Sequence, residues 1–153
     1  MMVMARDTDY PGLLEQVRGR RVLIWTCSTC ARLCNGLGGQ DAADRLAEAL
    51  RGDGVDVVGT ACVSASCITS KVEKNMPEGD YDTVVSLTCD MGASCAGDVS
   101  GMPVLNPVIT FGPGYRASDG TVRLRSLVCG NVVKDEPVED VAERTGAVAG
   151  PYV

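Results

Sequence analysis

A short apolar run leads directly into three closely spaced cysteines, and this arrangement restricts the fold more than any other part of the sequence. Residues 22–25 are apolar without interruption, as expected of a strand that is buried on both faces of a parallel sheet. Cys27, Cys30 and Cys34 follow at once, and a glycine-rich break then leads into a predicted helix. The thiols are therefore expected in the loop at the carboxyl end of a strand, where open α/β sheets bind their ligands.

The same order of strand, short loop and helix recurs along the chain. Apolar, valine-rich runs at residues 55–60 and 81–88 predict two further strands, and each leads into a loop that contains cysteine. Residues 40–51 form the clearest predicted helix, because their apolar positions recur at helical spacing and glycines follow their end. Such connections imply right-handed crossovers. We therefore expect an α/β fold, a single domain with a mostly parallel sheet and flanking helices, flavodoxin-like in outline.

Weaker patterns complete the chain and set its expected boundaries. A helix at residues 9–19 is expected within an N-terminal helical extension, residues 1–20. Asp119-Gly120 predicts the turn of a C-terminal hairpin. The cysteine-rich α/β domain is expected to span residues 21–133. Residues 134–153 are expected to form an acidic tail that contains Gly and Pro. The other expected elements are helices at 66–76 and 91–99, a strand at 103–110 and a Gly-Pro loop at 111–115.

Composition limits what such a domain can do. The chain has 14 Lys and Arg against 20 Asp and Glu, a net charge of -6, so we expect no nucleic-acid partner. No apolar run is long enough for a signal peptide or a membrane span, and we expect a cytoplasmic protein. Eight cysteines in a reducing compartment indicate metal binding or redox chemistry. Since histidine is absent, thiolates must be the chief metal ligands.

Cysteines follow three of the predicted strands. Because parallel strands end at the same edge of a sheet, thiols that are distant in sequence should meet there. Cys27, Cys30 and Cys34 lie on one loop and can face a single metal centre, and a fourth ligand must come from another strand end. The cysteines expected to act only as small core residues are Cys62, Cys95 and Cys129.

Thiolate ligands suit either an iron-sulfur cluster or tetrahedral zinc. The residues alone leave zinc and an iron-sulfur cluster open, and eight thiols would also suffice for two clusters. A reading without metal is a redox pair of Cys27 and Cys30. The backbone amides of Gly36, Gly38 and Gly39 are expected to donate hydrogen bonds to the cofactor.

Residues 21–114 resemble a known family. The segment VLIWTCSTCARLC, followed by Gly-Gly and a helix containing LAEALR, is similar to part of the small iron-sulfur subunit of bacterial methylenetetrahydrofolate reductase, often described as a zinc-binding C-terminal domain. YDTVVSLTCDMGAS resembles that family's YDAVLSLACGVGVQ, which places Cys89 on a motif cysteine, and PVLNPVITFGPG resembles its PVYPALNT segment. Cys67 matches the family cysteine near the second strand. The resemblance therefore implies Cys27, Cys30, Cys67 and Cys89 as the ligands, with Cys34 as the competing thiol. Ser28 stands where the family has glycine, and the family's downstream cysteine cluster is reduced to Cys129.

The resemblance implies one 4Fe-4S cluster, no substrate site on this chain, and electron exchange with a larger flavin-containing or iron-sulfur oxidoreductase subunit. We therefore expect an electron-transfer subunit that serves a methylenetetrahydrofolate reductase or a similar flavoenzyme, and that is itself an accessory protein more than an enzyme. The alternatives are a zinc-stapled, non-redox interaction subunit and a thiol-disulfide redox protein.

Overall fold

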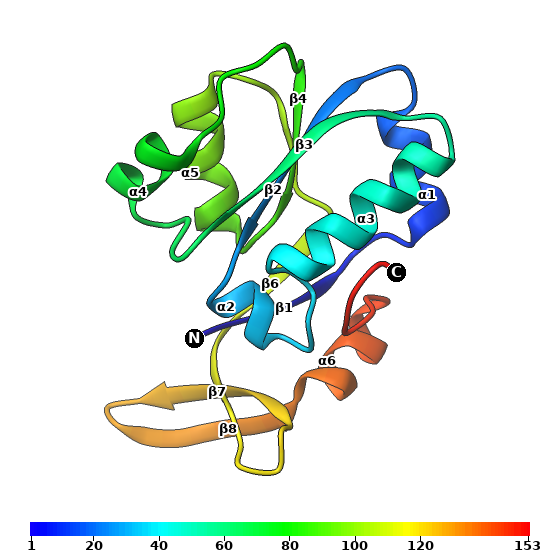
Figure 1. Cartoon of the computed structure of the whole chain (residues 1–153). Coiled ribbons are helices and arrows are strands. Elements are labelled where there is room, and N and C mark those ends of the chain that lie inside the picture. The colour runs from blue at the N-terminus through cyan, green and yellow to red at the C-terminus, as the bar shows by residue number, and fades with distance from the viewer.

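The computed structural model describes residues 1–153 and divides the strands between two sheets (Figure 1). One four-stranded sheet is parallel, with strand order β3-β2-β4-β5, and the other is antiparallel, with order β1-β6-β7-β8. In chain order the elements are β1 (Met2–Arg6), α1 (Tyr10–Val17), β2 (Arg21–Cys27), α2 (Cys30–Leu33), α3 (Gln40–Gly52), β3 (Asp56–Val63), α4 (Thr69–Asn75), β4 (Thr83–Leu87), α5 (Asp90–Ser100), β5 (Val104–Leu105), β6 (Val108–Arg116), β7 (Val122–Val128), β8 (Asn131–Pro137) and α6 (Val138–Thr145).

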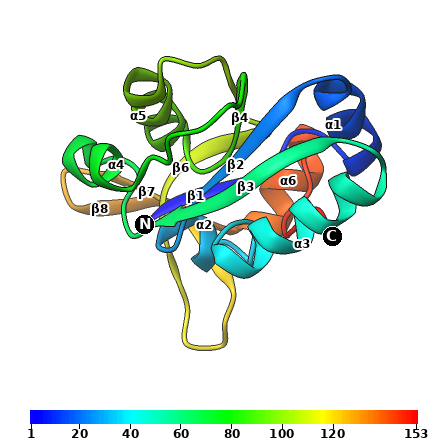
Figure 2. The same cartoon turned by 45° about the horizontal axis from the view of Figure 1, so that its top comes forward.

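Helices cover both faces of the parallel sheet. Figure 2 shows α1 and α3 on one side of the sheet and α4 and α5 on the other. The central strand β2 is buried at every residue after Arg21, because its apolar run packs against both helical layers. Trp25 is fully buried, and its indole N–H donates to the Ser66 hydroxyl at 2.8 Å. The sequence therefore predicts this layer of the fold correctly.

The individual elements of the parallel layer also agree with the sequence patterns. The helix expected at 40–51 is α3, and the strands expected at 55–60 and 81–88 are β3 and β4. The helices expected at 66–76 and 91–99 correspond to α4 and α5. Each of the three helices buries at least one residue on the side that faces the sheet. That periodic burial is the physical origin of the pattern.

The expectation of one mostly parallel sheet is wrong for half of the strands. The single strand expected at 103–110 is two strands, and the chain passes from the parallel to the antiparallel sheet between β5 and β6. Pro107 lies at this passage and has no N–H to donate to a strand ladder. The Gly-Pro loop expected at 111–115 lies inside β6. Gly114 allows this, because a Cβ at that position would overlap the backbone of Arg123 in β7.

Both ends of the chain belong to folded elements. The N-terminal segment does contain the expected helix α1, whose cap Asp9 accepts the Gly12 N–H at 2.9 Å, but it begins with β1. The three central residues of β1 are buried, because the strand pairs with β6. The segment expected as a tail carries part of β8 and then α6, which buries Val138 and Val141. Apolar residues of these two segments pack in one core cluster with residues of the first cysteine motif, and so join the antiparallel sheet to the rest of the protein.

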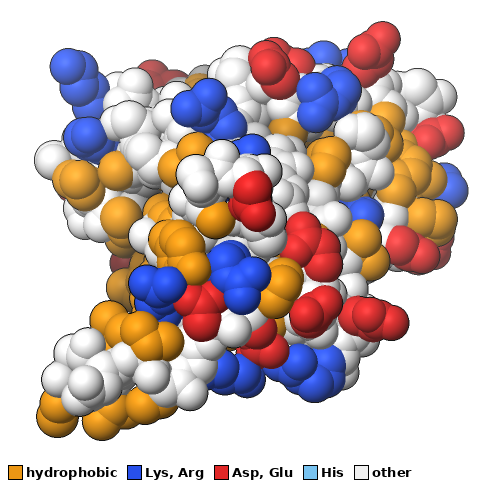
Figure 3. All heavy atoms as spheres, turned by 90° about the horizontal axis from the view of Figure 1, so that it is seen from below, with side chains coloured by type: hydrophobic (Ala, Val, Ile, Leu, Met, Phe, Trp, Pro, Cys, Tyr) orange, Lys and Arg blue, Asp and Glu red, His pale blue; other side chains and the backbone are white.

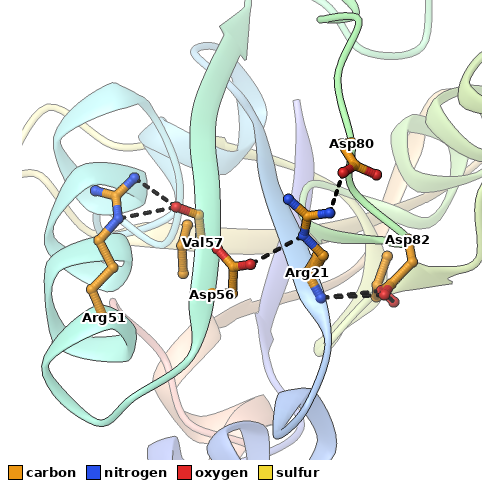
Figure 4. Close-up of polar contacts among 7 residues, drawn as sticks. Arg21, Arg51, Asp56, Val57, Asp80 and Asp82 are labelled. Carbon is orange, nitrogen blue, oxygen red and sulfur yellow. Dashed lines mark hydrogen bonds and ion pairs between the residues drawn. The ribbon is translucent and has the colours of Figure 1, made fainter.

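Charged contacts tie together the amino ends of the parallel strands (Figure 4). The Arg21 guanidinium, at the start of β2, contacts Asp80 and lies 3.1 Å from Asp56 at the start of β3. The Arg21 backbone N–H donates to the Asp82 carboxylate at 3.3 Å, just before β4. These side chains are exposed, so each pair adds little stability. They lie at the edge of the sheet opposite the cysteines.

Candidate thiol site

Six of the eight cysteines lie at or just beyond the carboxyl ends of β2, β3 and β4, a region called here the thiol edge. Parallel crossovers bring these strand ends together from segments up to about sixty residues apart. The expected convergence of the three strand-end loops is therefore present in the fold. The cysteines of the thiol edge are Cys27, Cys30, Cys34, Cys62, Cys67 and Cys89.

The short helix α2 presents two thiols to strand β1. The backbone N–H of Met2 donates to the Cys30 sulfur at 3.4 Å, and the Cys34 thiol donates to the Met2 carbonyl at 3.3 Å. The chain turns directly after Cys34, where Asn35 has a positive φ of 51°. One residue of the antiparallel sheet thus contacts two of the three thiols in the first cysteine motif. The sequence gives no sign of this contact, because β1 and the motif are separated by α1.

The Cys34 thiol lies in an apolar environment and is only 1 % exposed. Burial raises its pKa to about 11, and the nearby thiols of Cys30 and Cys89 raise the pKa further, against the lowering effect of a Met4 backbone hydrogen bond. The thiol is therefore protonated at neutral pH. A positive centre such as a metal would be needed to hold it as a thiolate.

Cys89 is the residue that precedes α5, at the end of β4. Burial raises its pKa, and the neighbouring thiols of Cys30 and Cys67 raise it as well, while the backbone N–H groups of Gly92 and Met91 lower it. Two amides from the first turn of α5 thus act on this sulfur. Cys30 thus acts on the pKa values of both Cys34 and Cys89, and Cys67 acts on that of Cys89.

Cys27 is directed towards the end of β3. Its sulfur lies 3.0 Å from the Thr29 hydroxyl oxygen, and its thiol donates weakly to the Ser64 carbonyl at 3.7 Å. Burial raises the pKa of Cys62 in β3, and Cys27 is the nearby thiol that raises it further. Cys27 thus lies near Cys62, and it also packs in one cluster with Cys34, against which Cys30 and Cys89 are packed. The two cysteines of the C-x-x-C motif contact different elements, since Cys30 faces β1.

The spacing of the thiols bears on which centre they could hold. No three Cys, Asp or Glu side chains come close enough together to hold a single metal ion. Tetrahedral zinc with Zn–S bonds of about 2.3 Å requires four sulfurs within about 4 Å of one another. A 4Fe-4S cluster carries its thiolates on four separate iron atoms and so accepts ligands that are farther apart.

The expected role of Gly36, Gly38 and Gly39 in cofactor binding is not supported, because their amides have partners within the protein. The Gly36 N–H donates to the Arg32 carbonyl at 3.1 Å and the Gly38 N–H to the Ala31 carbonyl at 3.0 Å. The Gly39 N–H donates to a threonine hydroxyl in β2 at 2.9 Å. No hydrogen of these three amides is left to donate to a cofactor sulfur.

That hydroxyl belongs to Thr26, and it connects three elements next to the thiols. It accepts from Gly39 at the start of α3 and donates to the Leu87 carbonyl at the end of β4, at 3.1 Å. The loop passes so close that a Cβ at Gly38 would lie 2.6 Å from the Thr26 oxygen and 2.8 Å from the Leu87 oxygen. The glycines are therefore required for packing the loop against the strand ends.

The three cysteines expected as core residues differ from one another. Cys95 packs with the cluster between the sheet and α5, as expected. Cys62 is half-buried and lines a hollow of about 510 Å³ together with Arg32 and Arg45. Cys129 is exposed in the turn between β7 and β8, with a φ of 49°, so the expectation is wrong for this residue.

Comparison of the chain with protein-family models, curated proteins and solved structures found no match. The resemblance to the reductase subunit thus rests on the motifs of the sequence alone. Among the six helices, none has the length and apolar character that crossing a lipid bilayer demands.

Proposed function

We propose that the chain is an iron-sulfur electron-transfer subunit that holds one 4Fe-4S cluster through Cys30, Cys34, Cys67 and Cys89. The observation that carries the proposal is that the loops after β2, β3 and β4 bring these cysteines to one edge of the sheet, where Cys30 and Cys34 both contact Met2. This set differs from the one that the family resemblance implies, because Cys34 takes the place of Cys27. The contacts of Cys27 with Thr29 and the β3 end support the exchange.

The residues around these thiols suit a buried anionic centre. When bound, the cluster would supply one-electron transfer. The Met2 N–H at Cys30 and the amides of Gly92 and Met91 near Cys89 donate hydrogen bonds to sulfur. Such donors stabilise negative charge on sulfur and thereby raise a cluster's reduction potential. The nearly complete burial of Cys34 keeps water away from one side of the site.

The topology supports the same location. The order β3-β2-β4-β5 corresponds to the first four strands of the flavodoxin-like arrangement, whose strand order reverses between β2 and β4. Cys30 and Cys34 follow β2, and Cys89 follows β4, so the proposed ligands flank that switch point. The motif resemblance to the methylenetetrahydrofolate reductase subunit supports a larger flavin-containing or iron-sulfur subunit as the electron partner.

Iron and sulfide analysis of protein purified without oxygen tests the proposal. We expect four iron and four sulfide per chain and an electron paramagnetic resonance signal after reduction with dithionite. Serine substitution of any one proposed ligand should lower the iron content. The matched controls Cys27→Ser, Cys95→Ser and Cys129→Ser should retain it.

Several outcomes would overturn the proposal in different ways. Colourless protein with one zinc per chain would establish the zinc-stapled alternative. Iron lost from Cys27→Ser but kept in Cys34→Ser would restore the ligand set that the family resemblance implies. Eight iron atoms per chain would indicate two clusters, and a protein that binds no metal in any form would leave thiol-disulfide chemistry.

A further inference from the structure

The loop between β3 and α4, residues 64–68, carries Cys67 and is anchored at two points. The Ser64 carbonyl accepts from the Thr29 hydroxyl at 2.8 Å, which ties the start of the loop to the first cysteine motif. Ser66, two residues further on, is only 2 % exposed, whereas Cys67 is exposed. The contacts of Ser66 therefore decide where the Cys67 thiol lies, because this thiol is not held by packing around its own side chain.

The Ser66 hydroxyl connects the loop to two other elements. It accepts the indole N–H of Trp25 in β2 at 2.8 Å, and it donates to the carbonyl of Gly92 in the first turn of α5, also at 2.8 Å. Trp25 and Gly92 are both buried. No other hydrogen bond joins residues 64–68 to α5. One hydroxyl group thus fixes the loop to a strand on one side and to a helix on the other.

This contact joins the neighbours of two thiols. Ser66 directly precedes Cys67, and Gly92 lies three residues after Cys89. The Gly92 peptide acts on both sides, because its carbonyl accepts from Ser66 while its N–H is one of the two amides that act on the Cys89 sulfur. A displacement of Gly92 would therefore move the anchor of Cys67 and a donor to Cys89 together.

The packing around Gly92 leaves little room for such a displacement. A Cβ at this position would lie 2.9 Å from the Ser66 Cβ and 2.9 Å from the Thr88 hydroxyl oxygen. Thr88 is completely buried, and its hydroxyl lies 2.7 Å from that of Ser86 in β4. The loop and the end of β4 therefore enclose Gly92 closely on two sides.

An iron-sulfur cluster needs its ligands at fixed positions, since each thiolate binds a separate iron atom of a rigid core. Residues that do not bind the metal themselves hold such ligands in place through hydrogen bonds. Ser66 has the contacts of such a residue, because it adjoins one proposed ligand and is bonded to the helix that follows another.

We propose that Ser66 is a positioning residue of the thiol edge, which sets the spacing of Cys67 and Cys89 by holding loop 64–68 against the first turn of α5. The role of these two cysteines as cluster ligands rests on the proposed function. The positioning itself rests on the hydrogen bonds of Ser66 and does not depend on a metal centre.

Cross-linking of metal-free, reduced protein tests the spacing. Wild type, Ser66→Ala and the matched control Ser64→Ala are treated with dibromobimane, and peptide mapping measures how much Cys67 is joined to Cys89. The control removes a hydroxyl from the same loop whose partner is Lys71 in α4 and not α5. We expect the cross-link in the wild type and in the control, and a yield about tenfold lower in Ser66→Ala, because the freed loop lowers the effective concentration of one thiol at the other.

Two further variants separate positioning from a general loss of packing. Trp25→Phe also removes a buried hydrogen bond of Ser66 but keeps the bond to Gly92, so it should retain the cross-link. Gly92→Ala keeps the Ser66 hydroxyl but pushes the loop away from α5, so it should lower the cross-link. Circular dichroism checks that each form is folded.

Cys129 serves as an internal control in every sample. It is exposed in the turn between β7 and β8, and Figure 3 shows this hairpin as an arm that projects from the body of the molecule. Its rate of alkylation should be the same in all forms. Differences at Cys67 then come from the loop and not from the reagent.

Each form is also reconstituted with iron and sulfide without oxygen, and its reduction potential is measured. We expect a more negative potential in Ser66→Ala than in the wild type and in Ser64→Ala, because the Gly92 amide is no longer held against the Cys89 sulfur.

The outcomes distinguish failure of this inference from failure of the proposed function. A cross-link yield in Ser66→Ala equal to that of the wild type, or an equal loss in Ser64→Ala or Trp25→Phe, overturns the positioning role whatever the iron content. A wild type in which Cys67 and Cys89 are not joined overturns it as well, and so does an iron-loaded Ser66→Ala with the wild-type potential. If no form binds iron while Ser66→Ala and Gly92→Ala alone lose the cross-link, the proposed function fails and the positioning role stands.

Discussion

Replacing Thr26 by valine tests the structural basis of the thiol edge, because it removes one hydroxyl group and keeps the shape of the side chain. Thr26 is completely buried. Its hydroxyl accepts the Gly39 N–H at 2.9 Å and donates to the Leu87 carbonyl at 3.1 Å. In Thr26→Val both backbone groups lose this partner, and no space opens for water to replace it.

The magnitude follows from the burial of the Gly39 amide. A buried donor without a partner costs about 1 to 3 kcal/mol, and the isosteric change creates no cavity that would add to this cost. We therefore expect Thr26→Val to lower the free energy of unfolding by about 2 kcal/mol. For a domain of this size, that corresponds to a decrease in melting temperature of roughly 4 to 8 °C.

Amide hydrogen exchange distinguishes this effect from a general loss of packing. The Gly39 amide should exchange slowly in the wild type and much faster in Thr26→Val. The control Thr26→Ser keeps the hydroxyl and removes a methyl group, so it should preserve slow exchange at Gly39 even if it costs about 1 kcal/mol of stability. A valine variant that is as stable as the wild type, with Gly39 still protected, would refute the role assigned to this hydroxyl.

Three further predictions concern other parts of the molecule. Gly38→Ala should lower the free energy of unfolding by about 3 kcal/mol, because its Cβ would overlap Thr26 and Leu87. Gly36→Ala has open space around the new Cβ and a positive φ of 71°, and should lower it by about 1 kcal/mol. Urea titrations of the two variants measure both values. Arg123 and Arg125 lower the pKa of Asp135 to about 2. The stability that this carboxylate contributes is present above its unfolded pKa of about 4 and is lost as the pH falls towards 2. Unfolding followed by circular dichroism between these pH values should therefore show a weaker pH dependence of stability in Asp135→Asn than in the wild type. In metal-free protein, peptide mapping should find Cys67 and Cys129 alkylated first and Cys34 last, because Cys34 is buried and has a pKa of about 11; rapid alkylation of Cys34 would contradict its placement.

The parallel layer of the fold was predictable because its signals are local. The unbroken apolar run of β2 and the periodic face of α3 each reflect burial within a few neighbouring residues. The antiparallel layer lacks such signals. β8 has the sequence NVVKDEP and is mostly exposed, and β1 finds its partner more than a hundred residues along the chain. Long-range pairing of this kind leaves little trace in a window of adjacent residues.

The thiol site was predictable in its location and not in its detail. Strand ends of a parallel sheet converge whatever the side chains do, so the spacing correctly brought Cys67 and Cys89 to the same edge as the first motif. The direction of each sulfur depends on contacts with other segments. Met2 binds the sulfurs of Cys30 and Cys34, while Ser64 accepts from Cys27, and neither contact follows from sequence spacing.

The pairing of β1 with β6 has a consequence for how the protein is made. β1 is synthesised first, yet Met2 pairs with Pro113 in β6 and must wait until β6 has left the ribosome. At a synthesis rate of about 5 to 20 residues per second, this happens several seconds later. The parallel layer is complete by β5, so its thiols can gather while the side later closed by β1 is still open. During that interval Cys30 and Cys34 are accessible, because Met2 does not yet cover them. Pulse-labelling of nascent chains should find Cys34 reactive until β6 has emerged and protected afterwards.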